Sequence, residues 1–191
     1  IPTGFKKVNT LNLPPEDDII LRPQRFFDTV LYTGNGSTQS VSGLEFKPDF
    51  VWIKERSSNS SNQLYDVVRG ATKRLRSDTS DAEDTKSNGL TSFHDHGFVV
   101  GDHSAVNANG DSYVAWCWKA GGAAVTNNDG SITTQVSANQ DAGFSIVTYT
   151  GNGTDGATIG HGLGKAPVMR FGRARSDIGS IGSAGPHLSL I

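Results

Sequence analysis

The stretch FDTVLYTGNGS at residues 27–37 returns as FSIVTYTGNGT at residues 144–154, so Tyr32 and Tyr149 stand 117 residues apart. In each copy, β-branched and aromatic residues followed by Gly-Asn-Gly predict a strand, a tight turn and a second strand. A proline then marks a break before a third strand. The match continues further along the chain at an offset of 119 residues. Leu44, Pro48, Arg56 and Ser57 correspond to Leu163, Pro167, Arg175 and Ser176. A two-residue insertion near His161-Gly162 explains the change of offset.

The composition favours strands over helices. Only 35% of the 191 residues are hydrophobic, while 23 are glycine, which indicates many turns and short elements. We therefore predict an all-β chain that folds as an antiparallel β-sandwich, of jelly-roll or concanavalin-like type, built on the duplicated strand–turn–strand unit.

Several classes of partner are disfavoured. A net charge of -2 supplies no basic field for nucleic acid, and no apolar run approaches the roughly 18 residues needed to span a bilayer. Cys117 is the single cysteine, so no internal disulfide can form. Because the chain begins at Ile1 without Met, we expect a fragment or a processed product.

The expected organisation has five parts. Residues 1–25 form a linker from an upstream region, with one short strand at 18–21. Residues 26–122 form the first β module, and residues 123–142 form a connector with a polar strand. Residues 143–176 form a partial second copy, and 177–191 a Gly/Ser-rich tail in which we expect no strand. A partial copy would expose sheet edges and an apolar face, so we expect it to pack within this chain or in an oligomer.

Two segments of the first module are predicted to be central. Residues 50–54 are nearly all apolar, which favours a central strand with Trp52 as a core anchor. Residues 112–119 carry large side chains on both faces, typical of a strand buried in the middle of a sandwich. Cys117 lies on that strand and is predicted to be a small buried hydrophobe rather than a nucleophile.

Two groups of residues are candidates for ligand contact. Residues 69–76 contain four cations. These indicate either a solvated turn or a contact to an acidic sugar through Arg69, Arg74 and Arg76. The acids of residues 78–86 could neutralise these cations. Asn107, Asn109 and Asp111 lie in a polar loop beside an aromatic strand, a combination used for sugar recognition, although plain β-sandwich loops look the same.

Catalytic and metal-binding motifs are weak. His94 and His96 could meet one ion if they lay on a strand, but the segment is more simply a polar turn, and no further ligand is fixed by spacing. Glu45 and Glu55 are replaced in the second copy by Gly164 and Ala174, so the duplication preserves no carboxylate pair. We predict no catalytic residue, no metal and no cofactor.

A family resemblance follows from residues 113–122 and 144–153, with further matches at 50–54, 66–70 and 90–93. From about residue 26 to 175 the chain resembles an uncharacterised β-rich domain of virion and tail-fibre-like proteins of marine tailed bacteriophages. The resemblance implies a virion location and a non-enzymatic structural or receptor-binding role. The implied partners are other virion proteins or copies of itself, as in a homotrimer, and a host-surface glycan. The alternatives are a polysaccharide-degrading enzyme on a β-sandwich and a secreted carbohydrate-binding module.

Overall fold

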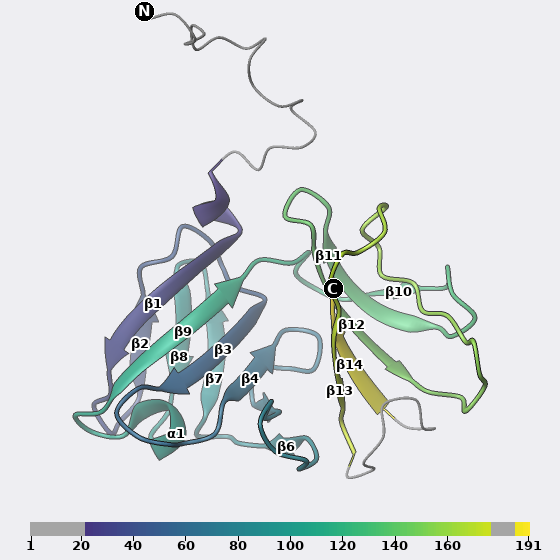
Figure 1. Ribbon diagram of the computed structural model, residues 1–191. Coiled ribbons are helices and arrows are strands. Elements are labelled where there is room, and N and C mark those ends of the chain that lie inside the picture. The colour runs from purple at the N-terminus through teal and green to yellow at the C-terminus, as the bar shows by residue number, and fades with distance from the viewer. Residues whose placement is uncertain (1–21, 177–185) are drawn as a thin grey trace, which may run out of the picture.

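The computed structural model describes residues 22–176 and 186–191. The strand predicted at residues 18–21 and most of the predicted linker lie outside the described residues. A short 3-10 turn, η3 (Pro23–Arg25), leads into the first strand. The described chain is an all-β structure of antiparallel sheets, as predicted, and it holds three main sheets (Figure 1).

The central sheet has the order β1-β9-β3-β4. Its strands are β1 (Phe27–Thr33), β9 (Ser112–Trp118), β3 (Phe50–Glu55) and β4 (Gln63–Asp66). In β9, Tyr113, Ala115 and Cys117 are fully buried on one face, while Trp116 and Trp118 are half-buried on the other. The predictions of central strands at residues 50–54 and 112–119, and of a buried Cys117, are confirmed.

An outer sheet covers one face of the central sheet. It consists of β2 (Gln39–Ser42), β8 (Gly97–Val100) and β7 (Leu90–His94), and a small ribbon of β5 (Lys73–Arg74) and β6 (Asp84–Thr85) lies nearby. Alternate residues of both sheets, such as Ile53 and Phe98, bury against each other in one core cluster. The helix α1 (Ser104–Asn107) closes one end of this sandwich through Val106.

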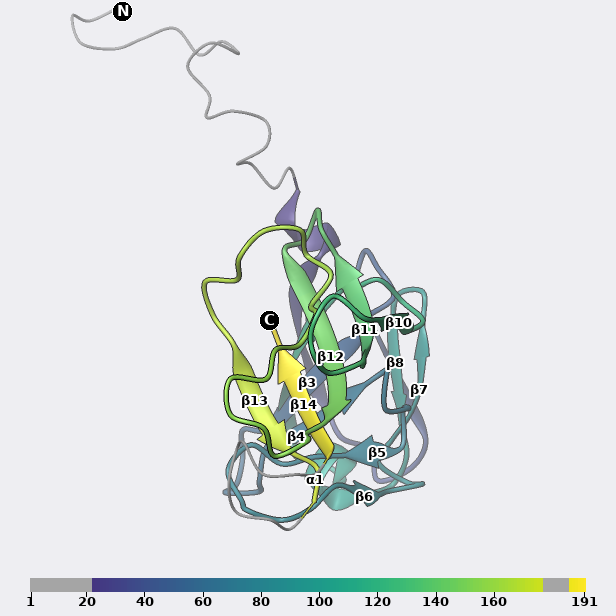
Figure 2. The same ribbon diagram turned by 90° about the vertical axis from the view of Figure 1, so that its right-hand side faces the viewer.

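A five-stranded C-terminal sheet covers part of the other face of the central sheet and leaves Leu31 of β1 exposed (Figure 2). Its strands, in order, are β10 (Val125–Asn127), β11 (Thr134–Asn139), β12 (Phe144–Thr150), β14 (Pro186–Leu190) and β13 (Phe171–Ala174). Residues 123–142, predicted as a connector with one polar strand, thus supply two strands. A second core cluster lies between the two sheets, where Trp118 and Phe144 stack with ring centroids 6.0 Å apart.

Ring contacts and polar contacts both fix the C-terminal sheet to the first module. Trp52, predicted as a core anchor, lies half-buried at this second core with its ring 5.8 Å from that of Phe171. Arg175 forms an ion pair with Glu83 at 2.8 Å. Arg173 donates hydrogen bonds to the main-chain oxygens of Arg76, Thr79 and Asp81. The second copy therefore packs within its own chain, which is one of the two arrangements expected.

The expectation of a tail without strands is wrong. In the C-terminal sheet, β14 pairs with both β12 and β13, as β9 pairs with both β1 and β3 in the central sheet. The registers correspond: Leu190 lies opposite Ile146 and Phe171, as Trp116 lies opposite Thr29 and Trp52. The two copies therefore have the same strand order, in which the last strand of the copy lies between its first and third strands. Residues 186–190 supply this last strand in the second copy.

Candidate functional site

The three arginines of the predicted cationic contact at residues 69–76 are bonded to carboxylates. The Arg69 side chain is fully buried and bonds Asp66, Glu83 and the main-chain oxygen of Leu64. Arg74 pairs with Asp84 and Arg76 with Asp81, while Lys73 donates to the hydroxyl of Thr85. The structure therefore gives Arg69 and Arg74 a structural role in place of the predicted ligand contact.

The predicted histidine site is a turn. His94 ends β7, and the chain turns through residues 95–96 into β8. The ring Nε2 of His94 lies 3.1 Å from Ser40 Oγ, and the ring Nδ1 of His96 lies 3.3 Å from the main-chain oxygen of Leu44. Among the described residues, no group of three or more His, Cys, Asp or Glu is placed to hold a metal ion. The interpretation as a polar turn is confirmed.

The predicted sugar loop, residues 107–111, instead closes the first Gly-Asn-Gly turn. Asn107 is fully buried, and its amide donates to Asn35 Oδ1 at 3.2 Å and to the main-chain oxygen of Gly101 at 2.8 Å. Asp111 accepts from the main-chain N–H of Gly34 through its main-chain oxygen, and Asn109 is exposed. We call residues 104–111 the clasp, because they cover this turn.

The clasp also caps a pair of stacked rings in the first copy. Tyr32 and Tyr113 stack at 5.1 Å, and their hydroxyls donate to the main-chain oxygens of Val106 at 2.7 Å and Ser104 at 2.6 Å. Burial raises the pKa of both phenols, so they remain donors. A Cβ added at Gly34 would lie 2.1 Å from the main-chain oxygen of Ala108, so only glycine permits this approach.

The second copy repeats the stacked rings of the first. Tyr149 and His187 lie opposite each other in register, as Tyr32 and Tyr113 do, and their rings stack at 5.0 Å. The counterpart of the clasp falls largely on residues 177–185, outside the described residues.

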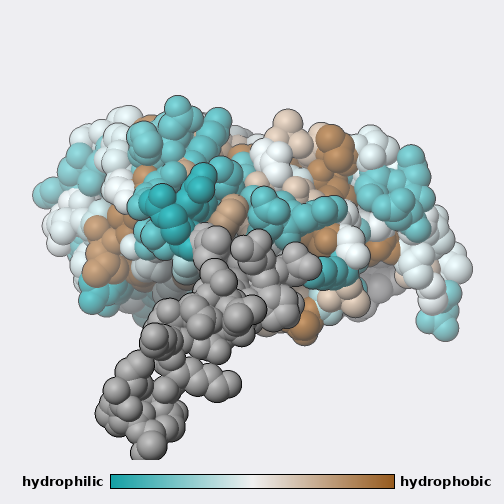
Figure 3. Space-filling view, turned by 90° about the horizontal axis from the view of Figure 1, so that it is seen from above, coloured by the Kyte–Doolittle hydropathy of each residue, from teal (hydrophilic) through white to brown (hydrophobic). Residues whose placement is uncertain are grey.

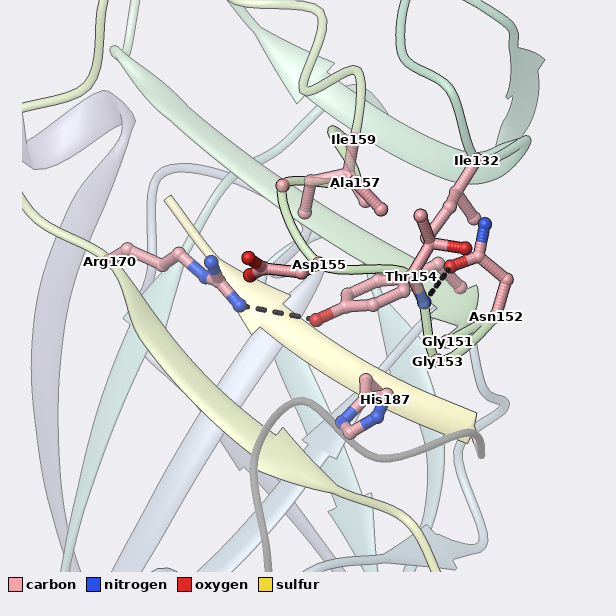
Figure 4. A pocket seen from close by; sticks show the side chains of 12 residues that line it. Ile132, Gly151, Asn152, Gly153, Thr154, Asp155, Ala157, Ile159, Arg170 and His187 are labelled. Atoms are coloured by element: carbon pink, nitrogen blue, oxygen red, sulfur yellow. Dashed lines mark hydrogen bonds between the residues drawn. The ribbon is translucent and has the colours of Figure 1, made fainter.

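A cavity of about 410 Å³ lies beside the second Gly-Asn-Gly turn in the described part of the chain (Figure 4). We call it the Tyr149 pocket. Its residues come from the end of β12, the following loop, β14 and the segments before β11 and β13: Ile132, Tyr149, Gly151, Asn152, Gly153, Thr154, Asp155, Gly156, Ala157, Ile159, Arg170 and His187.

Polar groups in the Tyr149 pocket are held in defined positions. The guanidinium of Arg170 donates from Nη2 to the hydroxyl of Tyr149 at 3.1 Å and from Nε to Ser189 Oγ at 3.3 Å. Asn152 Oδ1 accepts from the main-chain N–H of Thr154 at 3.0 Å, which fixes the turn. The carboxylate of Asp155 lies on the same side of the cavity as Arg170 (Figure 4).

The loop that walls the pocket is anchored to the sheet. The main-chain N–H of Thr158 donates to Ser131 Oγ at 2.8 Å, and the main-chain N–H of Ile132 donates to the oxygen of Thr158 at 3.0 Å. Thr134 Oγ1 donates to the main-chain oxygen of Gly160, and Ser145 Oγ to that of His161. A wall tied at several points loses little freedom when a ligand binds.

The chemistry of the pocket suits binding. A tyrosine ring, a guanidinium, an amide and glycine-rich backbone can hydrogen-bond hydroxyls and contact the apolar face of a sugar ring. Hydrolysis of a glycosidic bond generally needs two carboxyl groups about 5–10 Å apart. Asp155 is the one carboxylate lining the described pocket. Glu55, the acid considered in the sequence, is buried and bonded by Ser57 and Ser60.

A second hollow, of about 370 Å³, is almost wholly apolar. It lies between the central and C-terminal sheets and is lined by rings of Trp52, Trp118, Phe144 and Phe171. Large exposed hydrophobic side chains on the described surface are Phe27, Leu31, Val125, Val168 and Met169. In the face seen in Figure 3, hydrophobic groups are small and separated by hydrophilic ones. Arg170 lines this hollow as well as the Tyr149 pocket, but the Tyr149 pocket adds Tyr149, Asn152, Thr154 and Asp155 and is therefore the better candidate.

The sequence signal for the pocket was the repeated Gly-Asn-Gly turn with its preceding tyrosine. Arg170 and His187 carry no local signal, because they reach Tyr149 only through strand pairing. The family model of a domain of unknown function (DUF7483) matches residues 22–179. No curated protein and no solved structure matches the chain. In the described part of the chain, no helix has the length and hydropathy to cross a membrane.

Proposed function

Because the chain belongs to the DUF7483 family, whose description gives no function, we propose one from the site: a non-catalytic module that binds glycans through the Tyr149 pocket. One observation carries the proposal. A strand–turn scaffold with a stacked ring pair, which the clasp covers in the first copy, lines a cavity in the described part of the second copy. The first copy supplies the core, and the second presents the equivalent surface to a ligand.

The proposed setting is the surface of a phage particle. The resemblance to tail-fibre-like virion domains supports it, as does a shape in which three antiparallel sheets pack on one another. In this setting the module contacts a host-surface glycan, and its protein partners are other virion proteins or copies of itself in a homotrimer. The proposal includes no nucleic acid, membrane or cofactor.

The test is binding of the whole chain to a glycan array that includes marine bacterial surface polysaccharides, with mass spectrometry of the products. We expect binding without cleavage. Tyr149→Ala should weaken binding about fivefold, since loss of a stacked aromatic contact costs on the order of 1 kcal/mol. Leu31→Ala, at a residue 62% exposed on the central sheet outside the pocket, is the control and should bind normally.

Other outcomes overturn the proposal. Release of shorter products would indicate a polysaccharide-degrading enzyme. Absence of binding to any saccharide would remove the glycan role. Equal binding by wild type and Tyr149→Ala would move the site elsewhere on the surface.

A further inference from the structure

Arg170 differs from several other arginines of the described chain in what it bonds. Arg22, Arg69, Arg74 and Arg76 each form an ion pair with a carboxylate. Arg170 instead donates to two neutral hydroxyls, those of Tyr149 and Ser189. A guanidinium has five N–H donors. Within the described chain Arg170 therefore keeps both hydrogens of Nη1 and one of Nη2 for a ligand.

The two hydroxyls hold this guanidinium at the edge of the cavity (Figure 4). They use Nε and one Nη2 hydrogen, which leaves the Nη1 and Nη2 hydrogens to act as a planar fork. A planar fork matches a carboxylate in a bidentate pair, and such charge-assisted hydrogen bonds are roughly twice as strong as neutral ones. An acidic sugar can therefore be contacted at Arg170, a residue outside the predicted contact at residues 69–76.

A further hollow, of about 500 Å³, borders the Tyr149 pocket at Ile159 and has Lys165 and Gln140 in its lining. Lys165 is therefore a second cation in the neighbourhood of the Tyr149 pocket. Asp155 and Asp129 are the carboxylates of the two linings, and Asp129 already accepts a hydrogen bond from Asn127.

From these contacts we infer that the Tyr149 pocket selects a uronic-acid residue of an acidic polysaccharide, with its carboxylate on the Arg170 fork. The inference rests on the proposed glycan binding and names its ligand class. Asp155 opposes the ligand carboxylate and limits its affinity. Neutral sugars keep the ring and hydroxyl contacts but lose the fork.

The probe is a galacturonate oligosaccharide, compared with the same oligosaccharide after its carboxyl groups are reduced to primary alcohols. Isothermal titration with the whole chain should show the acidic form binding about tenfold or more tightly, because one charge-assisted pair contributes on the order of 1.5–3 kcal/mol. Arg170→Gln should abolish this preference, and Arg170→Lys should restore only part of it, since lysine keeps the charge without the fork.

Two further variants sharpen the test. Asp155→Asn should tighten binding of the acidic form and leave the reduced form unchanged. Arg56→Gln is the matched control, because Arg56 is an exposed arginine outside both hollows, and it should change nothing. Arg170 is also exposed, so thermal unfolding of Arg170→Gln should match wild type.

The outcomes separate the two claims. Equal affinity for acidic and reduced forms, or a preference that survives Arg170→Gln, overturns the inference while glycan binding stands. If neither form binds and the glycan array is also blank, the proposed function falls with it.

Discussion

Leu188→Ala tests whether the last strand is an integral part of the fold. Leu188 lies on β14, has no exposed surface, and packs in the second core with Phe50 and Ile146. The change removes three carbons, worth about 2.4 kcal/mol at 0.8 kcal/mol each, and the cavity left behind adds to this. We expect a loss of about 3 kcal/mol in the free energy of unfolding, or roughly 6–12 °C in Tm.

The assay is urea unfolding followed by tryptophan fluorescence, which reports on Trp118 at the same core. Leu31→Ala is the matched control, since it makes the same chemical change on β1 at a residue that is 62% exposed. Its cost should stay below about 1 kcal/mol. If Leu188→Ala cost no more than the control, β14 would not be packed as described, and the completed second copy would be refuted.

Three further predictions concern buried groups. Arg69→Ala should cost about 3–5 kcal/mol of unfolding free energy, because it leaves Asp66 and Glu83 without a buried partner. At a temperature where the variant is folded, its glycan affinity should equal that of wild type. A loss of affinity under those conditions would show that Arg69 belongs to the binding site. Burial acts to raise the pKa of Glu83, but hydrogen bonds and charge from Arg175 and Arg69 outweigh it and hold this pKa below the ordinary 4.5. The stabilisation by Glu83 is therefore complete above about pH 4.5 and is lost as the pH falls further. Wild type should have a higher unfolding free energy than Glu83→Gln at about pH 6, and this difference should shrink as the pH falls toward about 3. A difference that stays constant with pH would contradict a lowered pKa of Glu83. Burial also raises the pKa of the Cys117 thiol, so a disulfide reagent should label it only with the kinetics of unfolding, and rapid labelling of the native chain would show that β9 is more open than described.

The parts of the fold predictable from sequence are those with strong local patterns. Residues 112–119 alternate between small or aromatic side chains on two faces, and a period of two with large residues on both faces specifies a strand in the middle of a sandwich. The repeated Gly-Asn-Gly turn likewise fixed the duplication. Both signals lie within a dozen residues, so no knowledge of distant partners is needed.

The tail strand could not be found in this way. In residues 186–190, Pro-His-Leu-Ser-Leu, polar and apolar side chains alternate as in a strand, but the segment is only five residues long. No residue in it is identical to the residue at the corresponding position of β9. Their strand character comes from pairing with both β12 and β13, which is a tertiary effect.

The candidate site was missed for a related reason. Arg69, Arg74 and Arg170 are alike in sequence, and only the folded chain brings acids to the first two and hydroxyls to the third. Asn107 likewise reads as a loop residue, although its amide is buried against the first turn. Ion pairing and burial depend on non-local contacts, so charge pattern alone could not distinguish a ligand contact from a structural one.

The most direct test of the central claim is an NMR titration of the ¹⁵N-labelled chain with the tightest-binding saccharide, because the two copies serve as each other's control. The account predicts that amides of residues 149–157 and of Arg170 shift, while the matching amides of residues 32–37 and the clasp, residues 104–111, stay in place. Shifts centred on residues 32–37 and the clasp, or spread over both copies alike, would contradict a binding site formed by the second copy.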